Sequence, residues 1–184
     1  MERADPRSRR DAYGSRINRA HSPTLAYAVP WATIVLASLL PVFPIASAAP
    51  LVPPIGLMVL VSWRLVRPGL LPVWAGVPFG AIDDLFSGQP FGSGVLLWSL
   101  AMIAIEAIEI RFPWRSFLQD WLIAGVITTG YIVAAALLSG ASPGTPLLGA
   151  LMPQILLSLL VYPIIARMVS ALDRFRLLRI RILA

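Results

Sequence analysis

Long runs without a charged side chain dominate the sequence and predict membrane-spanning helices. Four stretches contain no acidic or basic residue: 22–63, 68–82, 85–105 and 121–166. A helix needs about 20 apolar residues to cross the hydrocarbon core, so the two longest runs can each hold two crossings. Segments rich in proline, glycine and serine divide both runs. The pattern predicts six transmembrane helices in a compact all-α bundle, at about 25–47, 51–66, 68–86, 91–110, 117–138 and 147–169.

Arginine placement supports this number of helices. All 15 basic residues are arginine. They fall in the first tail, the second loop, the fourth loop and the last tail, whereas the first, third and fifth loops contain none. Arginine in short loops favours the cytoplasmic side of the membrane, so both termini are predicted to be cytoplasmic. The chain then divides into an arginine-rich arm (1–24), a six-helix transmembrane domain (25–169) and a basic tail (170–184).

Composition narrows the class of protein. Of the 184 residues, 58% are hydrophobic and 13% are charged, whereas about a quarter of a soluble domain is charged. The chain has no cysteine and one histidine, and no serine triad, metal cluster or nucleotide-binding loop can be assembled from it. We therefore expect a multi-pass membrane protein that is not an enzyme and needs no cofactor or metal. The net charge of +6 follows from topology and does not indicate nucleic acid binding.

Two adjacent carboxylates end the third predicted helix. Roughly 25 Å of helix separates Arg67 from Asp84, which places Asp83 and Asp84 near the outer interface. Neighbouring helical positions point about 100° apart, so the two carboxylates cannot share one acceptor. Free N–H groups at the start of the next helix would compensate a carboxylate. We predict that Asp84 fastens the turn at 87–92 to the fourth helix, while Asp83 faces water or a partner. Direct binding of a ligand or ion by this pair is the alternative.

Two glutamates near the inner interface form a second candidate site. Glu106 and Glu109 are three residues apart on one helical face and repel each other. Four arginines lie at the same membrane level and could neutralise them: Arg64, Arg67, Arg111 and Arg115. We predict interfacial ion pairs, and the alternative is a cytoplasmic interface (Glu106, Glu109, Arg111 and Arg115) that docks a basic partner. No carboxylate falls at the membrane midplane, which argues against an ion pump or a proton relay.

Three further patterns indicate packing. Gly76 and Gly80 form a GxxxG motif that allows close helix approach, by default within the same chain. Ser116 and Gln119 fit a capping box at the start of the fifth helix. Prolines inside the predicted helices free backbone carbonyls, which need partners within the bundle.

The turn after the third helix carries a specific motif. In the segment FGAIDDLFSGQPFG (79–92), five residues follow the pattern Asp-Leu-x-Ser-Gly-x-x-x-Gly: Asp84, Leu85, Ser87, Gly88 and Gly92. This segment resembles the signature of the MreD family of rod shape-determining proteins. Phe91 stands where the family usually has leucine, and Asp83 occupies a commonly apolar position. Chain size, helix number and the basic, aromatic loop at 111–115 are also similar.

The resemblance implies a non-catalytic scaffold of the cell-elongation machinery in the bacterial inner membrane. Its expected partner is MreC, in a complex with MreB, RodA and a penicillin-binding transpeptidase that makes peptidoglycan, and its tails would contact membrane lipids. The signature turn would then be structural or partner-binding. The family is also distantly similar to the substrate-binding subunits of energy-coupling-factor (ECF) vitamin transporters. This similarity provides the alternative function, a subunit that binds a small, vitamin-like molecule.

Overall fold

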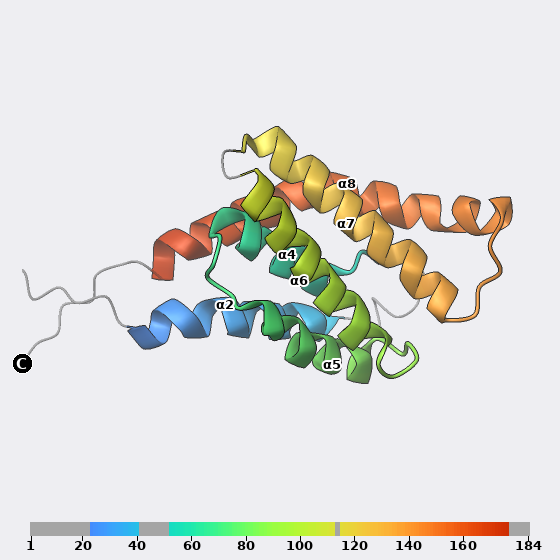
Figure 1. The fold of residues 1–184 in the computed structure, drawn as a ribbon, viewed down its shortest axis with the longest axis horizontal. Helices are drawn as coiled ribbons and strands as arrows, with labels where there is room; N and C mark the ends of the chain where they lie inside the picture. Colours follow the sequence, from blue (N-terminus) through green and yellow to red (C-terminus); the bar gives the residue numbers. More distant parts are fainter. Residues whose placement is uncertain (1–22, 41–51, 113–114, 177–184) are drawn as a thin grey trace, which may run out of the picture.

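The fold is a bundle of helices (Figure 1). The computed structural model describes residues 23–40, 52–112 and 115–176, and within these ranges it contains no strand. The α-helices follow in the order α2 (Pro23–Ser38), α4 (Ile55–Val66), α5 (Gly76–Phe86), α6 (Ser93–Arg111), α7 (Phe117–Leu138) and α8 (Thr145–Arg176), with a 3-10 turn, η2 (Val73–Ala75), before α5. The predicted all-α class is confirmed, and the described residues contain six α-helices, the number predicted.

Three of these helices are long and apolar enough to cross a membrane: α6, α7 and α8. The described parts of α2 and α4 are shorter apolar helices. The first predicted helix, at 25–47, extends past residue 40, so its end lies outside the described residues. α5 has 11 residues, or roughly 16 Å of helix.

The third helix begins later than predicted. The charge-free run at 68–82 was expected to be helical from 68, but α5 starts at Gly76. Gly69 has a φ of 77°, a left-handed conformation that ends regular structure after α4. Pro68 and Pro72 frame this connection, whose central residue Leu71 is buried. A run without charged residues does not distinguish an apolar loop from a helix, so the connection at 68–75 was predicted to be helical.

The last helix is longer than predicted. Its expected end was 169, followed by a basic tail from 170, but α8 continues to Arg176. Asp173 and Arg176 are both buried, with 5% and 7% of their surface exposed. The first seven residues of the predicted tail are therefore part of the bundle, and residues 177–184 lie outside the described ranges.

α4 lies at the centre of the bundle. Every residue from Gly56 to Leu65 is buried, because α2, α6, α7 and α8 all pack against this helix. The largest fully buried apolar side chains include Trp63, Trp98 and Phe79. The interior is thus filled by large side chains from α4, α5 and α6.

Trp121 donates a hydrogen bond to a backbone carbonyl that a proline leaves free in α8. Pro163 has no N–H and leaves the carbonyl of Leu159 without its helical donor. The indole Nε1 of Trp121 on α7 donates to this carbonyl at 3.0 Å. The predicted need of a freed carbonyl for a partner inside the bundle is confirmed at this position, and the contact joins α7 to α8.

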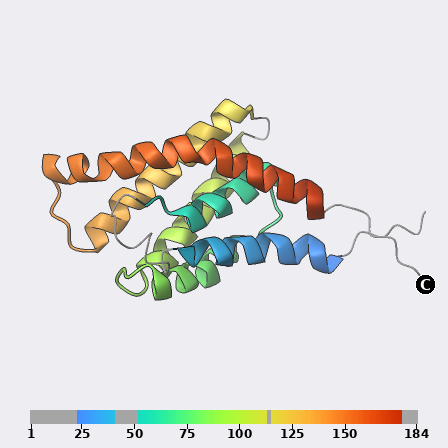
Figure 2. The same cartoon turned by 180° about the vertical axis from the view of Figure 1, so that it is seen from behind.

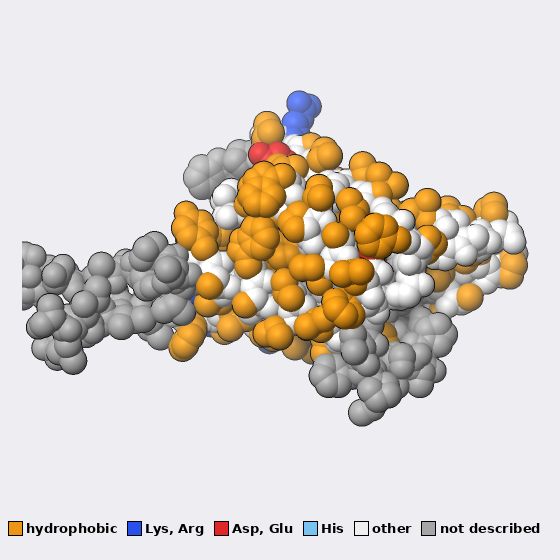
Figure 3. Space-filling view, turned by 90° about the horizontal axis from the view of Figure 1, so that it is seen from below, with side chains coloured by type: hydrophobic (Ala, Val, Ile, Leu, Met, Phe, Trp, Pro, Cys, Tyr) orange, Lys and Arg blue, Asp and Glu red, His pale blue; other side chains and the backbone are white. Residues whose placement is uncertain are grey.

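The beginning of α2 and the end of α8 lie at the same end of the bundle (Figures 1 and 2). The α5–α6 turn and the α7–α8 connection lie at the opposite end. Between the ends the surface is largely hydrophobic, as the space-filling view shows (Figure 3). Exposed apolar side chains of the long helices include Leu100, Ile103, Val126, Leu160 and Ile164.

Candidate functional site

Three glycines bring α5 and α6 into backbone contact. A Cβ added at Gly80 would lie 2.5 Å from the carbonyl oxygen of Gly94, and one added at Gly76 would lie 2.9 Å from the Cα of Ser99. A Cβ at Gly94 would in turn lie 2.8 Å from the carbonyl oxygen of Gly80. The predicted GxxxG motif therefore packs within the chain, against the N-terminal half of α6.

This close approach brings the carboxylate of Asp84 to the start of α6. Its oxygens accept hydrogen bonds from the backbone N–H groups of Gly92 at 2.8 Å, Gly94 at 2.6 Å and Val95 at 3.2 Å. These N–H groups have no helical acceptor of their own, and the positive end of the helix dipole favours a negative charge there. The predicted attachment of Asp84 to the fourth helix is confirmed, and we call this set of contacts the Asp84 clamp.

The remaining signature residues shape the turn. Gly88 and Gly92 have φ values of 71° and 97°, which residues with a side chain rarely adopt. The side chain of Ser87 is half-buried. Leu85 is 66% exposed. The fold therefore leaves the side chain of Leu85 available to lipid or a partner.

Asp83 does not face water, so that part of the prediction is wrong, whereas its contact with a partner or ligand stays a prediction. Its side chain is buried, with 8% of the residue exposed, and it accepts a hydrogen bond at 3.0 Å from the hydroxyl of Tyr131 on α7. The two carboxylates point apart, as predicted. Asp84 points toward α6, and Asp83 points toward α7. The partner of Asp83 lies 48 residues away, and no local pattern indicates it.

At the other end of the bundle, Arg64 joins α4 to α6. Its guanidinium is 1% exposed and pairs with both Glu106 and Glu109, with 2.7 Å between Nη2 and the Glu109 carboxylate. It also donates to the carbonyl of Leu71 at 2.6 Å. The predicted ion pairing is confirmed, and we call Arg64, Glu106, Glu109 and the Leu71 carbonyl the Arg64 cluster.

The other predicted arginines do not join this cluster. Arg115 pairs with Asp120 at 2.8 Å, next to the capping box of Ser116 and Gln119, which is present as predicted. Arg111 is exposed and pairs with neither glutamate in the described part of the chain.

A second ion-pair group was missed from the sequence. Asp173 on α8 accepts from Arg67 and from Arg176, each at 2.8 Å. The guanidinium of Arg176 lies 5.5 Å from the centre of the Trp63 ring, a cation–π contact. The i, i+3 spacing of Asp173 and Arg176 was the available signal for a helix beyond 169.

These observations define a class: a compact helical membrane protein whose polar side chains support the bundle from both ends. Among the described residues, no group of three or more His, Cys, Asp or Glu side chains could hold a metal. The family model of the rod shape-determining protein MreD matches residues 22–172, so the chain belongs to the MreD family. Membership implies a role in rod-shape determination, and members are membrane proteins. No curated protein and no solved structure matches significantly, so the similarity to ECF substrate-binding subunits stays a prediction.

Proposed function

We propose that this protein is a non-catalytic scaffold of the cell-elongation complex in the bacterial inner membrane. In this proposal it binds MreC and, with MreB, RodA and a penicillin-binding transpeptidase, helps to organise peptidoglycan synthesis. In this proposal the chain crosses the membrane six times, the third time by the segment 68–86 that ends in α5, and both termini are cytoplasmic.

The filled interior is the observation that carries this proposal. A carrier needs a cavity for its substrate, whereas here α4 is buried on all sides and Trp63, Trp98 and Phe79 occupy the centre. The Asp84 clamp joins α5 to α6, and the Arg64 cluster joins α4 to α6. Such an arrangement supports a rigid body that presents its outer surface to partners.

The apolar surface supports binding of a partner helix. Within lipid, helices associate through close packing and hydrogen bonds, because apolar burial gives little driving force there. The exposed faces of α6, α7 and α8 offer long apolar stripes for such packing. Leu85 adds an exposed signature side chain beside the Asp84 clamp.

The distribution of ion pairs supports the proposed topology. The Arg64 cluster, the Arg115–Asp120 pair and the Asp173 group all involve arginines of the loops and tail predicted to be cytoplasmic. The opposite end contains the Asp84 clamp, and there the described residues include no arginine. This asymmetry favours an inner end at the arginines.

One observation favours the alternative, a subunit that binds a small molecule. A cavity of about 180 Å³ lies near the outer end, and Gln89, Tyr131, Ser139 and Gln154 contribute polar groups to its lining. Tyr131 connects it to the buried carboxylate of Asp83. A small polar ligand at this place would make Asp83 part of a binding site.

A pull-down from the host membranes in mild detergent tests the proposal. Tagged wild-type protein is compared with Asp84→Ala and with Ser142→Ala, an exposed change in the α7–α8 connection, at matched expression. We expect MreC and other elongation proteins with the wild type and with Ser142→Ala, and much less MreC with Asp84→Ala. Recovery of a transport ATPase and coupling subunit without elongation proteins would contradict the scaffold and support the alternative.

A further inference from the structure

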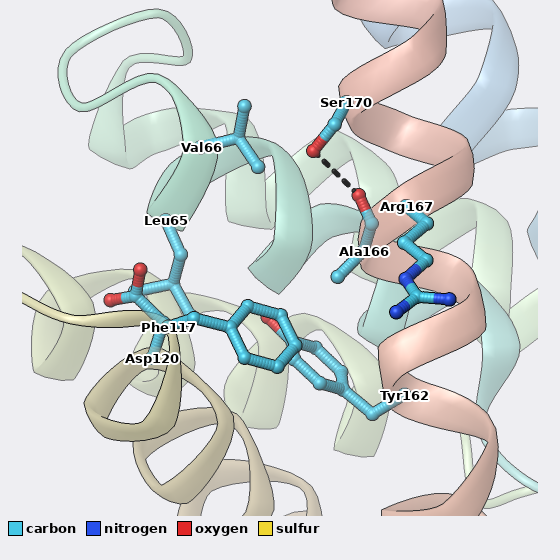
Figure 4. Close-up of a pocket in the computed structure, with 8 residues that line it drawn as sticks. All are labelled: Leu65, Val66, Phe117, Asp120, Tyr162, Ala166, Arg167 and Ser170. Atoms are coloured by element: carbon cyan, nitrogen blue, oxygen red, sulfur yellow. Dashed lines mark hydrogen bonds between the residues drawn. The ribbon is translucent and has the colours of Figure 1, made fainter.

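A cavity of about 270 Å³ lies between the end of α4, the start of α7 and the second half of α8 (Figure 4). Neither the Asp84 clamp nor the Arg64 cluster uses it. Leu65, Phe117 and Ala166 contribute apolar walls, and the buried side chain of Tyr162 also lines the cavity. The cavity is therefore large enough for a polar group of several atoms and apolar enough to contact the stem that carries it.

Two opposite charges face this cavity from different helices. Asp120 on α7 uses one carboxylate oxygen to accept from Arg115, and the hydrogen bonds of the described residues leave its other oxygen without a donor. Arg167 on α8 is exposed and takes part in no ion pair within the described ranges. Figure 4 shows the carboxylate and the guanidinium on opposite sides of the two aromatic rings.

The cavity lies at the arginine-rich end of the bundle. Asp120 is in the first turn of α7, next to the capping box, and Leu65 immediately follows Arg64. This level corresponds to the lipid headgroups of the inner leaflet. Pockets with basic side chains between helices on the cytoplasmic side are known as headgroup sites.

We propose that this cavity binds the headgroup of a zwitterionic aminophospholipid of the phosphatidylethanolamine class. Arg167 pairs with the phosphate, and the free oxygen of Asp120 accepts from the ammonium group. The rings of Phe117 and Tyr162 contact the short carbon chain that joins these two charges. An anionic lipid without an amine has no N–H group to donate to the free oxygen of Asp120. This site goes beyond the scaffold function and does not depend on it.

Native mass spectrometry of the purified full-length protein tests the lipid class. The protein in detergent is mixed separately with phosphatidylethanolamine, phosphatidylglycerol and phosphatidylcholine of identical acyl chains. We expect the first to stay bound best, because the trimethylated amine of phosphatidylcholine has no N–H to donate to Asp120. Stronger retention of phosphatidylglycerol, or equal retention of all three, would overturn the proposal.

Variants locate the site. Arg167→Gln should weaken phosphatidylethanolamine binding about tenfold, since a factor of ten corresponds to ~1.4 kcal/mol, the scale of a charge-assisted hydrogen bond. Arg174→Gln is the matched control, because Arg174 is an exposed arginine of α8 outside the cavity. Equal weakening by both variants would indicate nonspecific attraction and overturn the proposal.

Two further changes separate recognition from folding. Asp120→Asn should remove the preference for phosphatidylethanolamine over phosphatidylcholine, but it also breaks the ion pair with Arg115. Ser170→Leu keeps every charge and fills part of the cavity, so it should reduce binding of the lipid without removing a recognition group. If Ser170→Leu folds and binds phosphatidylethanolamine like the wild type, the lipid occupies another place and the proposal is wrong.

Discussion

The two ends of the bundle neutralise their carboxylates in different ways. At the end that holds the α5–α6 turn, Asp84 is held by backbone N–H groups of α6. At the arginine-rich end, Glu106 and Glu109 are held by the side chain of Arg64. Backbone donors are fixed by the helix, so the Asp84 clamp depends on the exact separation of α5 and α6. A long guanidinium adapts to its partners, so the Arg64 cluster depends on the presence of one cation.

Loss of Arg64 should have the largest effect. Arg64→Met keeps the length of the side chain but leaves Glu109, whose side chain is 10% exposed, without its cation, and removing one partner of a buried ion pair costs about 3–5 kcal/mol. Glu106 adds little to this loss, because its side chain is 42% exposed and solvent screens its charge. Thermal unfolding in detergent, followed by tryptophan fluorescence, measures the loss. Arg111→Met, an exposed change on the same end, is the control. Adding Glu109→Gln to Arg64→Met should recover part of the stability, and no recovery would show that Arg64 acts through packing alone.

A side chain at the α5–α6 contact should have the next largest effect. Gly80→Ala places a methyl group 2.5 Å from the carbonyl oxygen of Gly94, and overpacking of this kind costs about 1–3 kcal/mol. Gly130→Ala is the matched control on α7, because a Cβ there meets no atom within 4 Å. We expect unchanged or slightly higher stability for the control. Equal unfolding temperatures for the two variants would mean that α5 and α6 are not in backbone contact.

Removing the charge of Asp84 tests the Asp84 clamp directly. Asp84→Asn removes the charge and turns one acceptor into a donor that faces N–H groups, at a cost of about 1–3 kcal/mol. The protein should still insert, but protease should cut the turn at 87–92 more readily. Asp84→Asn with the same rate of cleavage as the wild type would refute the clamp.

Removal of the Tyr131 hydroxyl should have the smallest effect of the four. Tyr131→Phe leaves the buried carboxylate of Asp83 without its donor, which costs about 1–2 kcal/mol because the ring still packs. The double variant with Asp83→Asn gives the coupling energy between the two side chains in the same unfolding assay. A coupling of zero would contradict the hydrogen bond between them.

The sequence was informative where the controlling contact is local or electrostatic. The capping box at Ser116 lies within one turn, and the attachment of Asp84 follows from a carboxylate placed one short turn before a helix start. The pairing of glutamates with arginine follows from their common membrane level, although only the structure selects Arg64 from the four candidates.

Two of the failures have a common physical cause. The end of α8 and the orientation of Asp83 each depend on elements distant in sequence. Asp83 is oriented by Tyr131, and Asp173 by Arg67, which lies 106 residues away. Turn chemistry at Pro68 and Gly69 could have corrected the start of α5. No such signal existed for Asp83.

α5 is too short to enter a bilayer as an independent segment. Its 11 residues span about half of the hydrocarbon thickness and end in two carboxylates. We therefore expect it to move into the membrane together with α6, which supplies N–H groups for Asp84 and a glycine face for Gly76 and Gly80. The signature turn would then form the tip of a helical hairpin that inserts as one unit. A substitution that separates α5 from α6, such as Gly80→Ala, should reduce the amount of protein that reaches the membrane before it affects any partner, whereas Asp84→Asn leaves the glycine contacts in place.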